Sequence, residues 1–303
     1  MHLAIPTAQP FSFDQTLAFI RRFPAFQGQY IVTDDSLTAA LSVDGRPHAF
    51  TLREGLRLDL ADGVSPAVRR AIAARAAAFV GADDDVGALY DAARGDKAFS
   101  RLIPLLHGLH HVRFLTLQEI AVYSVLMQRA PAPAAAALNR RFITAFGTPI
   151  EIDGHTLRAM PELAELCQLS VDEIADAIRH RGKAERIVDV VRGVHAIGEH
   201  HLREAPYGEA RDALLAIRGV GPFSAAAILL RGLCRMDELP WMPQFESQAR
   251  SLYGASVDHH TIARRYGRLI GYWSFYVMTG VPRLNGEDHS GRQRTTASVT
   301  VRA

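Results

Sequence analysis

The segment LLAIRGVGPFSAAAILL, residues 214 to 230, contains the residues best suited to hold a phosphate group. Two apolar runs of helical composition flank a turn that contains Gly219, Gly221 and Pro222. Both glycines can adopt positive φ, and a proline in the first turn of a helix loses no hydrogen bond. The pattern predicts a tight helix–turn–helix whose second helix begins with unpaired N–H groups. Such a helix end attracts phosphate, although an ordinary corner between two helices would have the same sequence.

Histidines and aromatic residues are the other side chains that could do chemistry. His107 and His111 are spaced i, i+4, as two metal ligands on one helix face would be, but no third ligand follows at a fitting spacing. We therefore expect no metal site. Aromatic residues gather after the hairpin, where they could surround a cationic ligand by cation–π contact or could be ordinary core residues. They are Trp241, Phe245, Tyr272, Trp273 and Tyr276.

The composition is that of a soluble globular protein. The 303 residues are 48% hydrophobic and 22% charged, enough for one large or two ordinary domains. The net charge is only +2, so affinity for nucleic acid would depend on local clusters of basic residues. Cys167 and Cys234 are too few for an iron–sulfur cluster or a disulfide framework, which favours a reduced cytoplasmic protein. We expect no signal peptide and no membrane span.

Two regions of the chain differ in periodicity. In the first region, short alternating runs broken by Asp-Gly and Glu-Gly predict strands and hairpins. Helices are expected from Phe13 to Phe23 and after Ser65, so that residues 1–85 form an α+β domain. Residues 86–283 have helical periodicity almost throughout, and we expect the polar residues 284–303 to be disordered. The predicted fold is mainly α, with a two-lobed helical body, a cleft between its halves and an attached α+β domain.

The order of these parts resembles the helix-hairpin-helix (HhH-GPD) DNA glycosylase superfamily, and in particular the bacterial 3-methyladenine DNA glycosylase II group. The hairpin IRGVGPFSAAAILLRG is similar to that family's hydrophobic-x-Gly-Val/Ile-Gly core and its Thr/Ser-Ala helix start. Similar segments stand upstream, TLQEIAVYSVLMQRAPAPAAAALNRRFITAFG, and downstream, RRYGRLIGYWSFYVMTG. The resemblance covers roughly residues 10 to 283. It implies a glycosylase body and, at the N-terminus, the extra α+β domain of this group.

The resemblance implies binding of double-stranded DNA that contains damaged bases. Backbone amides of the hairpin would hold phosphate without reading sequence, and its carbonyls would bind a monovalent cation. The side chain of Arg129, in a loop, would fill the gap in the base stack as a nucleotide flips out. The alternative is that Arg129 is a solvated surface charge. The implied DNA-binding residues are Gly219, Gly221, Phe223 and Ser224 in the hairpin and Gln128 and Arg129 in the loop. The aromatic cluster would line the base pocket. We expect a monomer in the cytoplasm, associated with the nucleoid, that requires no cofactor.

The sequence departs from the family pattern at the catalytic Asp, which stabilises the cation-like sugar as the glycosidic bond breaks. That residue lies 22 positions beyond the second hairpin glycine, and here the position is Pro243. Removing such a carboxylate commonly costs roughly two to three orders of magnitude in rate. Glu246, about one helical turn further on, is the first candidate to replace it, and Asp237 in the preceding loop is the second. The third alternative is a protein that binds damaged DNA with weakened or lost cleavage chemistry.

A second departure concerns strand cleavage. Family members that also cut the abasic strand have a Lys four residues after the second glycine, where this chain has Ala225, so no Schiff base can form there. We therefore expect a monofunctional DNA glycosylase that hydrolytically removes damaged purines. The resemblance implies alkylated purines as the substrates. Because these bases carry a positive charge and leave readily, even a weakened enzyme could release them. The alternative is a catalytically silent protein that binds lesions.

Overall fold

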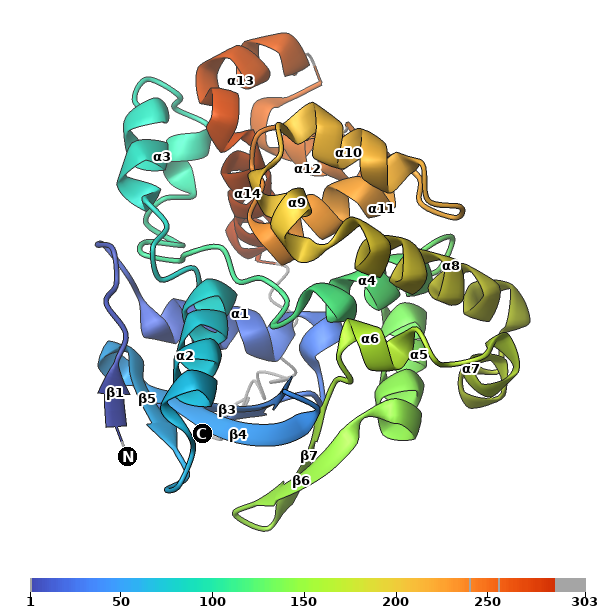
Figure 1. The fold of residues 1–303 in the computed structure, drawn as a ribbon. Coiled ribbons are helices and arrows are strands. Elements are labelled where there is room, and N and C mark those ends of the chain that lie inside the picture. The colour runs from blue at the N-terminus through green and yellow to red at the C-terminus, as the bar shows by residue number, and fades with distance from the viewer. Residues whose placement is uncertain (1, 240, 256, 287–303) are drawn as a thin grey trace, which may run out of the picture.

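An antiparallel sheet with two covering helices forms the N-terminal region of the computed structural model, which describes residues 2–239, 241–255 and 257–286 (Figure 1). The five strands have the order β1-β5-β4-β3-β2. The strands are β1 His2–Ala4, β2 Ile31–Val32, β3 Ser36–Val43, β4 Arg46–Arg53 and β5 Arg57–Leu60, and the helices are α1 Phe13–Arg22 and α2 Pro66–Val80. The predicted strands, hairpins and helices of this region are confirmed.

Local sequence signals explain where these elements begin and end. The hydroxyl of Ser12 accepts a bond from the N–H of Gln15 at the start of α1, and Ser65 caps α2 with a proline behind it. The turn between β3 and β4 has positive φ at Asp44 (53°) and Gly45 (70°), as a two-residue hairpin requires. The local sequence thus accounts for the ends of these helices and for the turn of this hairpin.

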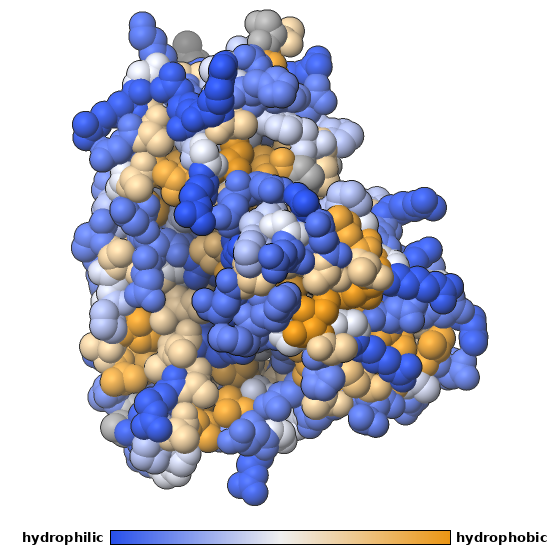
Figure 2. Space-filling view, turned by 45° about the horizontal axis from the view of Figure 1, so that its top comes forward, coloured by the Kyte–Doolittle hydropathy of each residue, from blue (hydrophilic) through white to orange (hydrophobic). Residues whose placement is uncertain are grey.

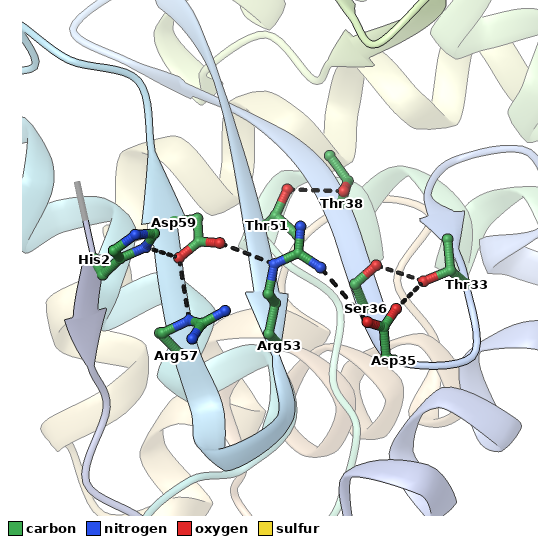
Figure 3. Close-up of polar contacts among 9 residues, drawn as sticks. All are labelled: His2, Thr33, Asp35, Ser36, Thr38, Thr51, Arg53, Arg57 and Asp59. Carbon is green, nitrogen blue, oxygen red and sulfur yellow. Dashed lines mark hydrogen bonds and ion pairs between the residues drawn. The ribbon is translucent and has the colours of Figure 1, made fainter.

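Polar side chains join neighbouring strands on the face of the sheet that is turned away from the core (Figure 3). His2 of β1 contacts the Asp59 carboxylate of β5, which also accepts a hydrogen bond from Arg53 Nε of β4 at 2.9 Å. Arg53 lies 3.7 Å from Asp35, beside the start of β3. Burial favours the neutral form of the Asp59 carboxyl, but its bonds to His2 and Arg53 outweigh burial and lower its pKa. The contacts hold the short edge strand β1 onto the sheet.

Helices make up most of the remaining chain, and they surround α14, which is buried along most of its length (Figure 1). The N-terminal half of this region contains α3 Val86–Ala92, α4 Leu117–Leu126, α5 Ala132–Phe146, α6 Leu163–Leu166, α7 Val171–Ile178 and α8 Arg181–Ile197. The C-terminal half contains α9 Glu199–Glu204, α10 Tyr207–Leu215, α11 Pro222–Ala227, α12 Pro243–Tyr253, α13 His259–Tyr266 and α14 Ile270–Leu284. Short 3-10 turns lie at Pro24–Phe26, Glu54–Leu56, Phe99–Arg101 and Gly267–Leu269, and a π-helical turn, η4, at Ile228–Gly232.

A second β-hairpin interrupts the helical region. Strands β6 Thr148–Ile152 and β7 His155–Ala159 pair around Asp153 and Gly154, both with positive φ. Leu157 and Ala159 pack against Ala40 of β3, so the hairpin lies on the N-terminal sheet. The prediction of helix almost throughout 86–283 is wrong for this segment. Its alternating residues around an Asp-Gly pair are the usual signal of a two-residue hairpin.

The two predicted domains share one hydrophobic core. Phe19 of α1 and Phe275 of α14 are 5.1 Å apart between ring centroids, and the Tyr272 hydroxyl donates to Asp84 Oδ2 at 2.6 Å. The first and last helices of the described chain are therefore in direct contact. Helix α14 extends to Leu284, and residues 287–303 of the expected tail lie outside the described residues.

The surface is mainly polar. Figure 2 shows hydrophilic residues over most of one face, with apolar residues in separate small areas. Among the described residues, the large hydrophobic side chains that remain exposed are Leu3 and Leu215. In the same residues, no helix is long and apolar enough to cross a membrane.

Candidate functional site

The predicted helix–turn–helix is formed by α10 and α11. Gly219 has φ +89°, and a Cβ there would lie 3.1 Å from Cγ of Arg186, so the position requires glycine. Gly221 has φ −100°, which any residue can adopt, and a Cβ there would meet no atom within 4 Å. Of the two glycines that could adopt positive φ, Gly219 does so and Gly221 does not. Pro222 begins α11 as expected, and open space adjoins the turn at Gly221.

The loop after α4 is tied to this hairpin. Gln128 Nε2 donates to the carbonyl of Gly219 at 2.8 Å and to the hydroxyl of Ser224 at 3.1 Å. Arg129 follows at the exposed tip with φ +51°, an uncommon conformation for a residue other than glycine, asparagine or aspartate. The structure thus brings together the hairpin and loop residues that the sequence assigned to DNA binding.

A buried lysine that sequence reasoning missed holds this loop in place. Lys183 Nζ at the start of α8 donates to the carbonyls of Val125, Leu126 and Gln128 at 3.0, 2.9 and 2.8 Å. These bonds satisfy carbonyls that the end of α4 leaves without intrahelical partners. Burial and the charge of Arg186 lower the pKa of Lys183. The sequence signal was the Lys-Ala pair at the start of the segment KAERIVDVVRGV, which resembles the family's pattern but gave Lys183 no role of its own.

A cavity of about 310 Å³ lies beside the loop and the hairpin. Its size is at the lower end of small-molecule sites, which span about 300–1,000 Å³. Its wall is mostly apolar and aromatic, with residues from both predicted domains. The lining residues are Phe19, Phe23, His111, Phe114, Ile120, Tyr123, Met127, Phe223, Ala226, Ala227, Leu230, Arg231, Glu238, Leu239, Met242, Phe245, Ser274, Phe275, Met278 and Thr279. Helix α1 therefore gives the N-terminal region a part in the site that the sequence did not predict.

Of the aromatic residues expected in the base pocket, only Phe245 lines this cavity. Tyr272, Trp273 and Tyr276 belong to the core, because α14 is buried on nearly all sides and turns Phe275 and Met278 toward the cavity instead. Trp241 stacks on His259 with 3.7 Å between ring centroids. The cavity is aromatic, but most of its rings are not the ones expected, and Phe19, Phe23 and Phe275 are among those that line it.

The acids near the family's Asp position are all paired with arginines. Glu246 does not line the cavity. Met242, just before α12, and Phe245 face the cavity, and Glu246 pairs along the helix with Arg250 at 2.6 Å. Asp237 also lies outside the lining and pairs with Arg268 at 3.2 Å. Glu238, which the sequence did not favour, does line the cavity.

Other chemical groups take structural positions. Ala225, at the place of the family's lysine, is buried. His110 bonds through its two ring nitrogens to the carbonyls of Gly81 and Pro10, and His107 stacks on Tyr90. Within the described part of the chain, no three His, Cys, Asp or Glu side chains are grouped to hold a metal ion.

A glycine hairpin, a loop bonded to it and an aromatic cavity beside both are the features of a helix-hairpin-helix protein that could bind nucleic acid and hold a base. Comparison with known proteins agrees with that class. No family model matches the chain. A DNA-3-methyladenine glycosylase of Bacillus subtilis (strain 168) is 29% identical over 154 residues, which is 50% of each chain. The chain thus aligns with about half the length of this curated relative.

Solved structures match over nearly the whole chain. The 3-methyladenine DNA glycosylase of Archaeoglobus fulgidus has a TM-score of 0.76 at 19% identity, over 94% of this chain and 98% of the other. An 8-oxoguanine glycosylase/lyase of Clostridium acetobutylicum in complex with DNA has a TM-score of 0.68 at 14% identity, over 91% and 93%. The chain has the fold of the helix-hairpin-helix DNA glycosylase superfamily and resembles its 3-methyladenine glycosylases.

Proposed function

We propose that this chain binds damaged duplex DNA and removes the damaged base as a DNA glycosylase. The observation that carries the proposal is the position of the cavity, whose wall contains Met127 next to the loop and Phe223 next to the hairpin turn. A nucleotide whose phosphates contact the hairpin could place its flipped base between the aromatic rings. Arg129, at the exposed loop tip, would fill the gap left in the stack. The names of the relatives support DNA repair and favour alkylated bases.

The proposed reaction is a hydrolysis. Water oxygen bonds to C1′ of the sugar, the bond from C1′ to the base nitrogen breaks, and water loses one proton. That proton goes to a base that leaves as an anion, or to solvent when a cationic alkylated base leaves as a neutral molecule. Among the three acids near Pro243, Glu238 is the one placed to stabilise the positive charge that develops on the sugar, because it lines the cavity. Strand cleavage is not part of the proposal, since Ala225 has no amine and Lys183 Nζ is engaged with three carbonyls.

The sequence predicts a monomer that requires no cofactor, and we keep both predictions. The one ion that it predicts is a monovalent cation at the hairpin. The carbonyls of Gly219 and Ile217 already accept hydrogen bonds from Gln128 and from the N–H of Val220. Each of these carbonyl oxygens keeps a second lone pair that a cation could use. No step of the proposed reaction depends on the cation. The predicted cytoplasmic, nucleoid-associated location also stays a prediction.

A second function, lesion binding without cleavage, is favoured by two observations. Pro243 stands at the catalytic position, and Glu238 forms an ion pair with Arg211 at 2.8 Å. A carboxylate held by an arginine is less able to stabilise a second cation. The cavity and hairpin would serve such a binding protein equally well.

Base release separates the two functions. Purified chain would be incubated with duplexes that each contain one 7-methylguanine, 3-methyladenine, hypoxanthine or 8-oxoguanine, and free base would be measured by mass spectrometry. Binding to a duplex with an abasic-site analogue would be measured in parallel. Base release supports the glycosylase, and tight lesion binding without release supports the second function. If the chain neither releases a base nor prefers any damaged duplex, both proposals are wrong.

A further inference from the structure

Arg231 places a cation in the wall of the aromatic cavity. It belongs to the π-helical turn η4, a geometry that often occurs at functional sites. Its guanidinium carbon lies 4.5 Å from the centroid of the Phe23 ring, 5.4 Å from Phe19 and 5.9 Å from Phe275. The side chain is thus held against the aromatic residues of α1 and α14 rather than extended into solvent.

The positive charge of Arg231 is not balanced by an acid. The side chain forms no ion pair with any residue that the structure describes, and its Nε and Nη2 atoms are buried there without a hydrogen-bond partner. Glu238, in the same cavity wall, pairs with Arg211 instead. Burial lowers the pKa of Arg231 to about 10, so the guanidinium is still protonated at neutral pH. An unpaired buried cation destabilises a fold, which makes a ligand-binding role the best explanation for its presence.

His111 adds a second unpaired polar group to the same wall. The residue is fully buried, and its ring lies 4.5 Å from that of Phe275. Among the described residues, neither Nδ1 nor Nε2 has a hydrogen-bond partner. Burial and the charges of Arg231 and Arg113 lower the pKa of His111 well below its ordinary value. The neutral ring therefore offers one N–H donor and one acceptor to a ligand.

We propose that Arg231, together with His111, makes the cavity select a neutral base that carries a carbonyl oxygen and exclude cationic N-alkylpurines. The inference rests on the proposed function and replaces the cationic purine that the sequence led us to expect. A guanidinium can donate two parallel bonds to O6 and N7 of hypoxanthine. In 8-oxoguanine N7 carries a hydrogen, so the acceptors there are the carbonyl oxygens. Such a base would supply the acceptors that Arg231 lacks, while the phenylalanine rings stack on its faces.

A cationic base would meet a like charge instead. Two positive charges a few ångströms apart in a water-poor cavity repel strongly enough to change affinity by roughly tenfold or more. Aromatic rings attract cations, but Phe19, Phe23 and Phe275 already hold the guanidinium in this way. The electron-rich wall thus stabilises Arg231 and leaves the cavity positive. A neutral oxopurine fits that charge better than 7-methylguanine does.

Binding to duplexes that differ in one base tests the inference. The duplexes carry hypoxanthine, 8-oxoguanine, cationic 7-methylguanine, an undamaged base or an abasic-site analogue, and a 2′-fluoro sugar prevents base loss during the measurement. We expect the neutral lesions to bind at least about tenfold more tightly than 7-methylguanine. Equal or tighter binding of 7-methylguanine overturns the inference while leaving the proposed function intact. Failure to bind any lesion above undamaged DNA overturns both.

Two variants assign the effect to Arg231. Arg231→Met removes the charge at similar volume, so the preference for neutral bases should fall to within about twofold, with unchanged affinity for the abasic analogue. Its melting temperature should rise, because the unpaired cation is gone. Arg231→Lys keeps a charge without the planar fork, so it should still exclude 7-methylguanine but bind hypoxanthine more weakly. Arg218→Met, at an exposed position beside Gly219, is the control and should weaken all duplexes equally. An unchanged preference in either Arg231 variant overturns the inference.

Discussion

The side-chain amide of Gln128 donates to the carbonyl of Gly219 at 2.8 Å, which joins the loop after α4 to the turn between α10 and α11. The two segments are 91 residues apart in the sequence. Lys183 bonds to the same loop, so hydrogen bonds join the loop both to the hairpin and to α8. A duplex that contacts the hairpin phosphates would therefore meet Arg129 and the cavity in a fixed relative position.

Gly221 offers a test of the hairpin that does not disturb folding. Its φ of −100° and the open space around it allow a side chain, so Gly221→Ala should unfold like the wild type. In the complex the same Cβ would point into the space proposed for phosphate. Gly221→Asp adds a negative charge there, and we expect its affinity for an abasic-site duplex to fall by roughly tenfold or more, with a smaller dependence on salt.

The control for Gly221→Asp is Gly208→Asp, which adds the same charge at the first turn of α10, at the other end of that helix. It should bind DNA as the wild type does. Fluorescence anisotropy at several salt concentrations measures both variants. Undiminished affinity of Gly221→Asp would show that the hairpin does not contact the DNA backbone.

Lys183 should contribute to stability as well as to the shape of the site. Lys183→Met removes the ammonium that bonds to the carbonyls of Val125, Leu126 and Gln128, in a place where Lys183 itself is only 5% exposed. The carbonyl of Val125 still accepts a bond from the N–H of Gln128. Leaving one buried polar group without its partner costs about 1–3 kcal/mol. We expect Lys183→Met to lower the free energy of unfolding by about 2–4 kcal/mol in total. Urea unfolding measures it, and the exposed Lys97→Met is the matched control. Equal midpoints for the two variants would contradict this role.

Glu119, at the start of α4, makes stability depend on pH. Burial favours its neutral form, outweighs the bond that it accepts from the N–H of Leu115, and raises its pKa from 4.5 to about 7. The folded chain therefore binds more protons than the unfolded chain between about pH 4.5 and 7. Within that window the free energy of unfolding falls as pH rises, and Glu119 accounts for up to about 3 kcal/mol of the fall. Above about pH 7 the contribution of Glu119 no longer changes with pH.

Glu119→Gln removes the titrating group at nearly constant shape. Thermal unfolding between pH 5 and 8 should then lose the part of the slope that comes from Glu119. Asp59, whose pKa is lowered, acts in the opposite direction: its contribution is lost as pH falls below the ordinary range of a carboxyl. The two groups are therefore separable by pH, and identical slopes for the wild type and Glu119→Gln would refute the assignment.

The fold could be predicted from local signals because most of its elements carry their own. Serine caps, Asp-Gly turns and helical periodicity mark α1, α2 and the strands β2 to β5, and the structure follows them. The missed hairpin β6–β7 carried the same Asp-Gly signal, but an expectation of helices throughout the region overrode it. Local signals do not predict that Phe19 packs against Phe275. This contact is part of the single hydrophobic core that both predicted domains share.

The site was harder to predict because its residues gather from distant segments. Gln128 and the hairpin lie on motifs, so their proximity followed from the resemblance. The composition of the cavity did not follow from the resemblance, because Phe23, His111 and Arg231 come from three segments with no common motif. A single arginine in an apolar run is also a common surface residue, so Arg231 gave no signal of its own. Helical spacing predicted that Glu246 would lie near the position of Pro243. The side chains that line the cavity there are instead those of Met242 and Phe245.

The acids around Pro243 give the last prediction. If the chain is a glycosylase, Glu238→Gln should lower base release by roughly two orders of magnitude while lesion binding stays within about twofold, because the carboxylate acts on charge that develops only in the transition state. Glu246→Gln is the matched control and should release base at the wild-type rate, since its side chain pairs with Arg250 outside the cavity wall.

Pro243→Asp supplies the complementary gain of function. An acid at the first position of α12 is favoured by the helix dipole, so this variant should fold, and it restores the family's carboxylate at the family's position. Base release measured in single turnover should rise above that of the wild type. If Glu238→Gln keeps full activity and Pro243→Asp gains none, the carboxylate is not Glu238 and the cleavage mechanism proposed for this chain is wrong. If the wild type is inactive and Pro243→Asp releases base, the chain is a lesion-binding protein that lost cleavage through this one position.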